Sequence, residues 1–408
     1  MTPRSLLLQG LLTIALGSTL PSAYAQTDSK PETVRAEIGK PLQEAAELVK
    51  NQQFAEALAK IKTTDAVADR TPFENLTIDR MRGAAAAGAG DLNLAVESFQ
   101  RVIDSGKLPP AEQLQLMEGI TASYFKVKDY AKAIIWGQRY FKEGGTSDNM
   151  KNIVLQSQYL SDNFAGANAS LKAQIQAEQQ AGQAVPEIQW QILADTSLKL
   201  KDMPAYMAAL EQLVQKYPKP AYWADMIARV SRQPGFSDRY MLDALRLQRA
   251  VGVLTSADDY LLMGELAMQA NLPAEALSVL DEAADKSVIT AAAQKARADK
   301  VRSQARSQAA GDQKALVEGE AAAQKAGNGT ALVNIGTNYL GQKQFDKAAT
   351  FLEQGIAKGG LKHPEEAKLH LGIALAQGGN KNKAAATFKS VQARDGGADL
   401  ARLWSYVK

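Results

Sequence analysis

The chain contains no cysteine and only two histidines among its 408 residues. Without cysteine there can be no disulfide bond, thiolate metal site, cysteine nucleophile or lipid anchor on cysteine. His363 and His370 have no partner at metal-ligand spacing, and no H-E-x-x-H motif is present. We therefore predict no metal and no cofactor, and we expect His370 to be a surface or groove residue.

The chain also has little excess of one charge over the other, with a net charge of +3. Nucleic-acid binding requires a concentrated basic face that neutralises phosphates, so no nucleic-acid partner is expected. The phosphate-binding motif G-x-x-x-x-G-K-[ST] and the nucleophile motif G-x-S-x-G are both missing. The sequence therefore predicts no catalytic residue and a protein that is not an enzyme. The alternative is an enzyme with an unrecognised site in residues 225–325.

The N-terminus has the features of an export signal. Arg4 precedes a mostly apolar stretch from Leu6 to Leu20, and Ala23-Tyr24-Ala25 forms a small-x-small cleavage pattern. We therefore predict a signal peptide at residues 1–25. No later stretch is apolar enough to span a bilayer, so no transmembrane segment is expected after cleavage. An exported chain without cysteine suits an oxidising compartment, and the bacterial periplasm is the expected location.

One short phrase recurs along the chain: two polar residues, an aromatic residue, two further residues and an alanine. It ends at Ala57, Ala133, Ala167 and Ala348, and variants without the aromatic residue end at Ala95, Ala276 and Ala384. Neighbouring copies lie 34 to 38 residues apart, as between Ala133 and Ala167 or between Ala57 and Ala95. This period is typical of helix-turn-helix units, which must stack because one unit cannot bury its apolar face alone.

These segments resemble tetratricopeptide repeats, whose pattern is W-x2-L-G-x2-Y…A-x3-F…P. The resemblance covers most of residues 40–390 and is weakest at 225–255 and 290–325. Together with the export signal, it suggests an exported member of the family from a Gram-negative bacterium. It implies an all-α fold, a right-handed superhelix (α-solenoid) of stacked helix pairs in which small residues let two helices approach closely. The positions that match structural slots of the family are Ala57, Ala95, Tyr124, Ala133, Trp190, Leu193, Pro218, Gly264, Ala276, Gly336, Tyr339, Ala348, Gly372, Ala384 and Phe388.

Proline, glycine and polar stretches predict how the chain is divided. Residues 26–40 are expected to form an extended lead-in, and residues 41–224 an N-terminal repeat array. The pattern breaks at Gln233-Pro234-Gly235, so residues 225–256 are predicted to be an irregular helical connector. A C-terminal array with a capping helix occupies residues 257–408. Within it, residues 286–325 have few large apolar side chains and are predicted to form solvent-exposed helices, whose basic residues either contact an acidic partner or are simply solvated.

The resemblance also implies a binding surface, because the first helices of such units line a concave face that holds peptides or helices. The candidate partner-binding residues are Glu118, Phe125, Gln191, Asp195, Lys199, Glu265, Met268, Gln269 and Asn334, with Ala122, Leu261, Thr337, Leu369 and Ile373 beside them. This lining mixes polar and apolar side chains and has no dominant charge. Such a groove is better suited to a protein segment than to a nucleic acid.

We therefore expect a non-enzymatic scaffold or adaptor in the periplasm, with partners among the proteins of the cell envelope. An assembly, transport or cell-wall complex is the expected setting. The alternative is a peptidoglycan- or polysaccharide-binding protein, which would need exposed aromatic residues such as Tyr222 and Trp223 for stacking on sugars. The sequence identifies neither the partner nor the oligomeric state.

Overall fold

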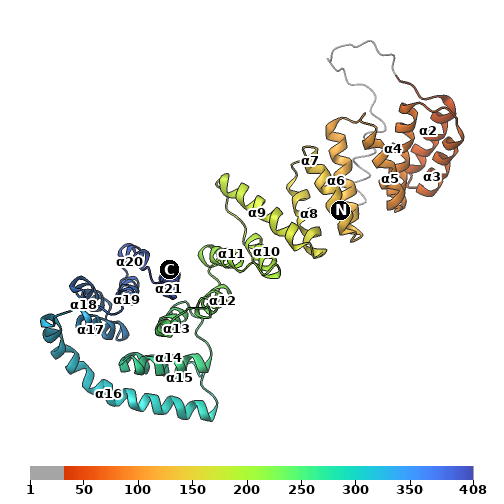
Figure 1. Cartoon of the computed structure of the whole chain (residues 1–408). Coiled ribbons are helices and arrows are strands. Elements are labelled where there is room, and N and C mark those ends of the chain that lie inside the picture. The colour runs from red at the N-terminus through yellow and green to blue at the C-terminus, as the bar shows by residue number, and fades with distance from the viewer. Residues whose placement is uncertain (1–31, 408) are drawn as a thin grey trace. The chain divides into compact units, whose positions relative to one another are not determined.

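The computed structural model describes residues 32–407, so the predicted signal peptide and the start of the lead-in lie outside the described residues. All regular structure between these limits is helical, and no strand occurs there (Figure 1). The chain forms two compact units that divide between Ala181 and Gly182, and each is described by itself. Within the described range, no helix combines the length and apolarity needed to cross a membrane.

Unit 1 consists of four antiparallel helix pairs. Their bounds are α2 (Ala36–Lys50), α3 (Phe54–Thr63), α4 (Pro72–Ala89), α5 (Leu92–Asp104), α6 (Pro110–Lys126), α7 (Tyr130–Lys142), α8 (Asp148–Leu160) and α9 (Phe164–Gln180). A short 3-10 helix, η1 (Thr64–Ala66), follows α3. The glycine- and proline-containing segments after α5, α7 and α9 are loops, as the sequence predicted.

The first helix begins earlier than predicted. Residues 36–40 belong to α2 and not to an extended lead-in, and Pro41 lies inside the helix. Pro41 is the sixth residue of α2, beyond the first turn, so its missing N–H removes a backbone hydrogen bond that Glu37 would otherwise accept. The start is anchored by Arg35, whose backbone N–H and guanidinium Nε donate to the Glu74 carboxylate at 3.0 and 2.9 Å.

The recurring phrase forms the same turn in every copy. Its first residue has a left-handed backbone, with φ between 56° and 86°, at Gln52, Gly90, Lys128, Asp162, Asn271, Lys343 and Gly379. Its second residue precedes the second helix, and the side chains of Asp91, Asp129 and Asn163 accept hydrogen bonds from backbone N–H groups of that helix. An eighth copy at Lys201-Asp202 makes the same turn. The sequence phrase misses it because Tyr206 replaces the alanine.

Close packing of a small residue against a large one joins the two helices of a pair. A Cβ atom added to Gly336 would lie 2.7 Å from Leu352 Cγ, and one added to Gly264 would lie 3.1 Å from Leu280 Cγ. In both pairs the large residue follows the glycine by 16 positions, and Gly372 faces Phe388 at the same spacing. All the predicted structural positions are buried except Pro218, which is exposed.

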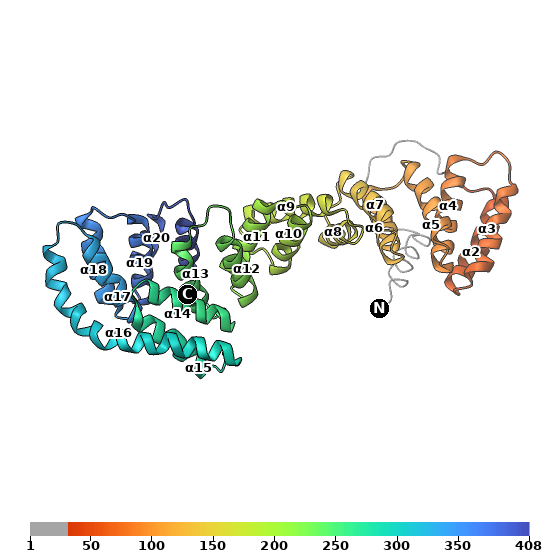
Figure 2. The ribbon, with the colours of Figure 1, turned by 60° about the horizontal axis from the view of Figure 1, so that its bottom comes forward.

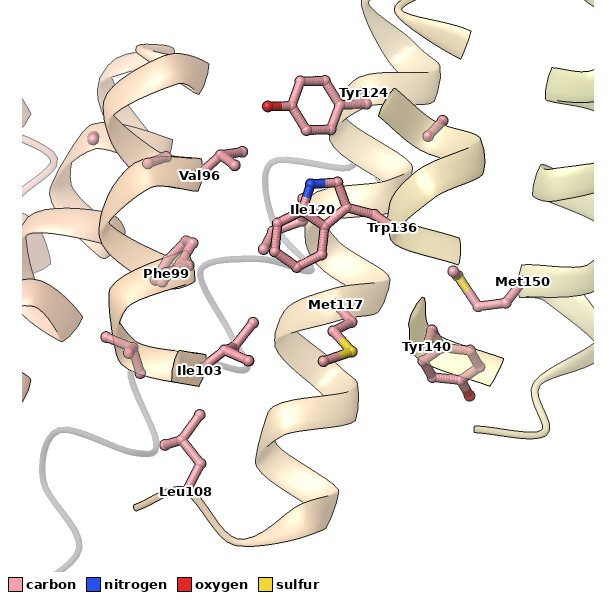
Figure 3. Packing of buried hydrophobic residues seen from close by; sticks show 14 of the residues in the cluster. Val96, Phe99, Ile103, Leu108, Met117, Ile120, Tyr124, Trp136, Tyr140 and Met150 are labelled. Atoms are coloured by element: carbon pink, nitrogen blue, oxygen red, sulfur yellow. The ribbon is translucent and has the colours of Figure 1, made fainter. Parts of the chain in front are cut away.

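Aromatic and aliphatic side chains of α5 to α8 form a continuous core in unit 1. Figure 3 shows Phe99 and Ile103 of α5 on one side of Met117 and Ile120 of α6, with Trp136 of α7 beside them. Tyr140 and Met150 extend this cluster to α8. The cluster therefore spans several helix pairs, which is how stacked repeats share one core.

Unit 2 begins with two further pairs and two more helices. The bounds are α10 (Glu187–Lys199), α11 (Met203–Lys216), α12 (Pro220–Ser231), α13 (Met241–Ala250), α14 (Ala257–Gln269) and α15 (Pro273–Asp285), with a 3-10 helix, η2 (Asp238–Tyr240), before α13. The predicted connector at 225–256 is thus more regular than expected. Pro234 and Gly235 interrupt only the link, while Ile227 of α12 and Leu245 of α13 are fully or almost fully buried.

A single long helix follows where the sequence predicted several. Helix α16 (Ala292–Lys325) has 34 residues. The segment contains no proline and is rich in alanine, so nothing stops the helix. At about 1.5 Å per residue it spans roughly 50 Å. The helix is largely exposed to solvent, as predicted. Among its described side chains, the buried ones are Ala298, Val301, Ala305 and Ala323.

After α16 the chain returns through two more pairs and a cap: α17 (Thr330–Gly341), α18 (Phe345–Lys358), α19 (Pro364–Gln377), α20 (Lys381–Lys389) and α21 (Gly397–Trp404). Figure 2 shows α16 running from α15 to the α17–α18 pair. Leu400, Leu403 and Trp404 of α21 are buried, as predicted for a capping helix. The fold class is therefore the predicted all-α arrangement of stacked helix-turn-helix pairs.

Candidate protein-binding surface

The first helix of unit 2 exposes large apolar side chains. Ile188, Gln191, Asp195 and Leu198 lie three or four residues apart on α10 and so share one face, which we call the α10 stripe. Ile188 is 57% exposed and Leu198 is 41% exposed. At the adjoining turn, Leu200 and Met203 are also exposed. Apolar side chains gathered on an open surface with polar neighbours are typical of a protein-binding site.

Polar groups of α10 and α12 border this stripe. The Tyr222 hydroxyl donates to the Glu187 carboxylate and is hydrogen-bonded to the Gln191 amide. Lys219 Nζ lies 2.7 Å from Glu187 Oε1. Hydrogen bonds from Lys219 and Tyr222 lower the pKa of the Glu187 carboxyl. The edge of the stripe is therefore organised and charged before any partner binds.

Three of the sequence-predicted candidates lie on or beside this stripe. Gln191 and Asp195 belong to it, and Lys199 pairs with Asp195 at 3.3 Å. Sequence reasoning missed Ile188 and Leu198, although both follow the helical spacing of the polar candidates. Their exposure was not evident, because an apolar residue on a repeat helix is more often buried.

The two candidates in unit 1 also have roles within their own pair. Phe125 is half-buried, and its ring centroid lies 5.9 Å from that of Tyr130. Glu118 is half-buried and hydrogen-bonded to the Tyr140 hydroxyl, and burial followed by this bond raises the pKa of Tyr140. Both side chains have the same intermediate exposure as Gln191 and Asp195 of the α10 stripe.

Some of the candidate partner-binding residues in the C-terminal part of unit 2 are exposed, and others are covered by neighbouring helices. Gln269 and Asn334 are exposed, whereas Glu265 pairs with Arg297 of α16 at 2.5 Å and Met268 packs against the core. Three residues that the sequence placed in an open groove are buried: Leu261, Leu369 and Ile373. Leu261 clusters with Leu280 and with Ala298 and Val301 of α16, so the long helix covers it.

A buried ionic cluster was not predicted. Arg246 of α13 lies 2.6 Å from Glu275 of α15 and 2.8 Å from Asp243, whose carboxylate is 3.1 Å from His370 Nε2. The prediction that His370 is a surface or groove residue is therefore wrong, since it is only 6% exposed. Burial acts to raise the pKa of Asp243, but the charges of His370 and Arg246 outweigh it and hold that pKa below its usual value. The carboxylates in turn keep the Arg246 pKa above its usual value despite burial.

The residues named for the two alternative functions can also be placed in the structure. All four tryptophans are buried, and Trp223, the residue on which sugar stacking depended, is 4% exposed. In residues 225–325, Asp281, Asp285 and Asp299 border an open surface hollow of about 760 Å³. Arg302 pairs with Asp281 and Asp299 at 2.9 and 3.1 Å, so one guanidinium is shared between two of these carboxylates. Among the described side chains, no group of three His, Cys, Asp or Glu residues is arranged to hold a metal ion.

Comparison with known proteins agrees with this geometry. The tetratricopeptide repeat family model matches residues 191–220 and 366–396, which contain most of the α10–α11 and α19–α20 pairs. None of the curated proteins matches the chain.

Several solved repeat structures are similar to it. The TPR2AB domain of yeast Sti1, solved as a pHSP90 complex, has 16% identity over 66% of this chain and 98% of its own, with a TM-score of 0.31. A tetratricopeptide repeat protein from Parabacteroides merdae has 10% identity over 83% of this chain and 99% of its own, with a TM-score of 0.30. Yeast Tom70 has 13% identity over 90% of this chain and 94% of its own, with a TM-score of 0.25.

The matched pairs share the left-handed link at Lys201 or Gly379 with the other pairs of the chain. Gly372 within the second match faces Phe388 in the small-against-large contact that also joins α14 to α15 and α17 to α18. The family model thus matches two of the helix pairs, and the remaining pairs share the hairpin geometry of those two.

Proposed function

We propose that the chain is a non-enzymatic scaffold of the bacterial periplasm that holds a peptide or helix of an envelope protein against the α10 stripe. The α10 stripe carries this proposal, because exposed Ile188 and Leu198 stand on either side of two polar side chains on a first helix. A partner segment could bury both apolar side chains and pair with Asp195 or Gln191. Such an arrangement gives affinity from apolar burial and orientation from the polar groups.

The cellular location in this proposal rests on the sequence. The apolar stretch before Ala25 and the small-x-small pattern suit export and cleavage. Fractionation of cells that express a C-terminally tagged chain, with N-terminal sequencing of the product, tests this part alone. A periplasmic product that begins at Gln26 supports it, and an uncleaved cytoplasmic product contradicts it.

Crosslinking in intact cells tests the binding surface. We would compare the natural chain with an Ile188→Glu/Leu198→Glu variant and identify the trapped proteins by mass spectrometry. A matched control is Val317→Glu on α16, where the natural side chain is similarly exposed. Circular dichroism of all three chains checks that folding is unchanged.

The expected result is a specific partner that is recovered with the natural chain and the control and is lost from the stripe variant. Loss is expected because two carboxylates would have to be desolvated against an apolar partner surface. Equal recovery from all three folded chains would show that the α10 stripe is not the binding surface. Failure to recover any specific partner would contradict the scaffold function itself.

A further inference from the structure

The α10 stripe has the spacing of a coiled-coil seam. Its positions are separated by three, four and three residues, at Ile188, Gln191, Asp195 and Leu198. This is the spacing of the two apolar positions of a heptad, which recur every 3.5 residues or so, about twice per heptad. A second helix laid along the stripe would therefore meet four successive layers, of which the outer two are apolar and the inner two are polar.

The hydrogen bonds of the two polar layers favour a helix over an extended segment. Gln191 is already bonded to the Tyr222 hydroxyl, and Asp195 pairs with Lys199 at 3.3 Å. The other contact of Gln191 Nε2, with Glu187 Oε1, is 3.5 Å long and so leaves an N–H to donate. An extended segment would need these few groups for its own backbone, whereas a helix satisfies its backbone internally. The stripe therefore suits a helix that offers one side chain to each polar layer.

The stripe is complementary to itself when a second copy of the chain approaches in the opposite direction. A twofold axis at position 193 places Ile188 of one copy opposite Leu198 of the other, and Gln191 opposite Asp195. Two apolar layers then enclose two layers in which an amide N–H donates to a carboxylate. A contact in which one surface serves on both copies is characteristic of a C2 dimer.

Charge selects the antiparallel direction. In a parallel pair each residue would face its own counterpart, so the Asp195 carboxylates of the two copies would repel each other between apolar layers. The antiparallel pair instead places an amide donor against each carboxylate. The same axis also brings exposed Leu200 opposite exposed Pro186, which adds one apolar contact at each end of the seam.

We infer that, when no partner is bound, the α10 stripe is covered by the α10 stripe of a second copy, packed antiparallel in a C2 dimer. The contact uses one short helix from each copy, whereas stable complexes bury roughly 1,200 Å² or more. The dimer is therefore weak and dissociates on dilution, and an envelope partner competes with it for Ile188 and Leu198. This competition rests on the proposed function, whereas the dimer itself does not.

Two substitutions at one position test the register of the dimer. Gln191→Lys places a cation opposite Asp195 of the second copy and should tighten the dimer roughly tenfold, whereas Gln191→Asp places a carboxylate there and should weaken it roughly tenfold. A parallel register would give weakening by both, because position 191 would then face itself. Ile188→Glu/Leu198→Glu should abolish the dimer, and Val317→Glu at an exposed position of α16 is the matched control. Sedimentation equilibrium of the purified chains from about 1 to about 200 μM measures the dimer, and circular dichroism checks folding.

Cysteine pairing tests the direction of the two helices, because the chain has no cysteine of its own. Ile188→Cys and Leu198→Cys chains mixed together should form an oxidised dimer. Neither should do so alone, since ten helical residues separate the two copies of one position by about 15 Å.

The inference is overturned if the natural chain is monomeric at every concentration, if the folded Ile188→Glu/Leu198→Glu variant still dimerises, if both Gln191 substitutions weaken the dimer, or if each cysteine chain crosslinks with itself as readily as the mixture does. A monomeric chain whose partner in intact cells is nevertheless lost from the stripe variant would leave the proposed function standing. The failure of the dimer and the failure of the scaffold are therefore distinguishable.

Discussion

At the scale of single residues, the repeated turn places ordinary side chains in a left-handed backbone. Lys128 and Lys201 have φ values of 63° and 58° at this position, where Gly90 and Gly379 serve in other copies. A side chain in this region brings its Cβ close to a carbonyl oxygen, at a cost of about 1 kcal/mol. Most copies of the turn therefore carry a small strain that glycine would remove.

Lys128→Gly is expected to stabilise unit 1 by about 0.5–1 kcal/mol, because relief of the strain exceeds the added entropy of the unfolded chain. Gln138→Gly is the matched control. Gln138 is exposed within α7, where glycine costs about 1 kcal/mol relative to a helix-favouring residue. Urea unfolding of the two variants checks the sign, and similar destabilisation by both would contradict the assignment of strain.

Gly336 illustrates a second residue-scale requirement, the close approach of two helices. A Cβ atom at this position would lie 2.9 Å from the Leu352 backbone nitrogen and 3.1 Å from the Ala348 carbonyl oxygen. Backbone atoms cannot rotate away as a flexible side chain can, so Gly336→Ala should destabilise unit 2 by about 2 kcal/mol. The control is Gly319→Ala, where the nearest atom is Ile335 Cδ1 at 3.9 Å.

Gly319→Ala should instead stabilise its helix by about 0.5–1 kcal/mol through helix propensity. Thermal unfolding followed by circular dichroism separates the two outcomes. Stabilisation by both substitutions would mean that the helix contact at Gly336 is looser than the structure shows.

The Glu74 carboxyl makes the stability of unit 1 depend on pH. The hydrogen bond from Arg35, with backbone N–H donors of Thr71 and Arg35, lowers the pKa of this carboxyl from 4.5 to about 2. A lowered pKa stabilises the fold above the unfolded value, and this contribution is lost as the pH falls from about 4.5 toward 2. Glu74→Gln should therefore weaken unit 1 at neutral pH and flatten its loss of stability in acid.

Urea midpoints measured between pH 7 and pH 2.5 test this dependence. Glu47→Gln is the control, because its carboxylate is 70% exposed and its 3.9 Å pair with Lys50 is at the surface. An acid profile for Glu74→Gln that is as steep as the natural one would contradict the assignment.

At the scale of elements, α13 combines two kinds of contact. Leu242 and Leu245 join the apolar cluster of α14 and α15, while Asp243 and Arg246 face the ionic cluster with His370. The helix is short, yet residues from three other helices fix its place. The stability of this part of unit 2 should therefore depend on whether the buried charges remain balanced.

Arg246→Met leaves Glu275 buried without its cation and Asp243 with His370 alone, and it should cost about 3–5 kcal/mol. Replacing all three by apolar residues of similar size, as Asp243→Leu/Arg246→Met/Glu275→Leu, should recover most of this loss, because no unpaired carboxylate remains. Chemical unfolding of the two variants is the measurement. If the triple variant is no more stable than Arg246→Met, lost packing and not unbalanced charge is the cause.

At the scale of the molecule, the chain consists of two compact units that divide between Ala181 and Gly182. The sequence placed its boundary between arrays at 225–256, and the helices of that segment, α12 and α13, belong to unit 2. Each unit has its own buried clusters, such as those around Met117 in unit 1 and Tyr260 in unit 2. A unit with its own core should fold without the other.

Residues 182–408 expressed alone should therefore keep helical circular dichroism and show one cooperative thermal transition. The matched comparison is a fragment of residues 257–408, which lacks α13 and with it the ionic partners of His370. This shorter fragment should unfold at a lower temperature. A 182–408 fragment without a cooperative transition would show that unit 2 depends on unit 1.

The sequence determined the repeat fold, because its signals are local. The αL residue, the capping side chain and the glycine that precedes a large residue by 16 positions all act within one helix pair, so their spacing is visible in the chain. It also located Gln191, Asp195 and Lys199 on the face where Ile188 and Leu198 are exposed. These are properties of a single helix and its nearest neighbour.

Only the tertiary structure decided where the regular stacking of helix pairs ends. Helix α16 carries the chain across unit 2, and α19 returns to α13, where His370 meets Asp243. His370, Leu369 and Ile373 are buried at positions where the repeat pattern places an open groove. The partners of this contact, Asp243 and His370, are 127 residues apart, and no local spacing relates them. Contacts of this kind depend on the length of a connecting helix and on long-range charge balance, which become visible only when the whole unit is folded.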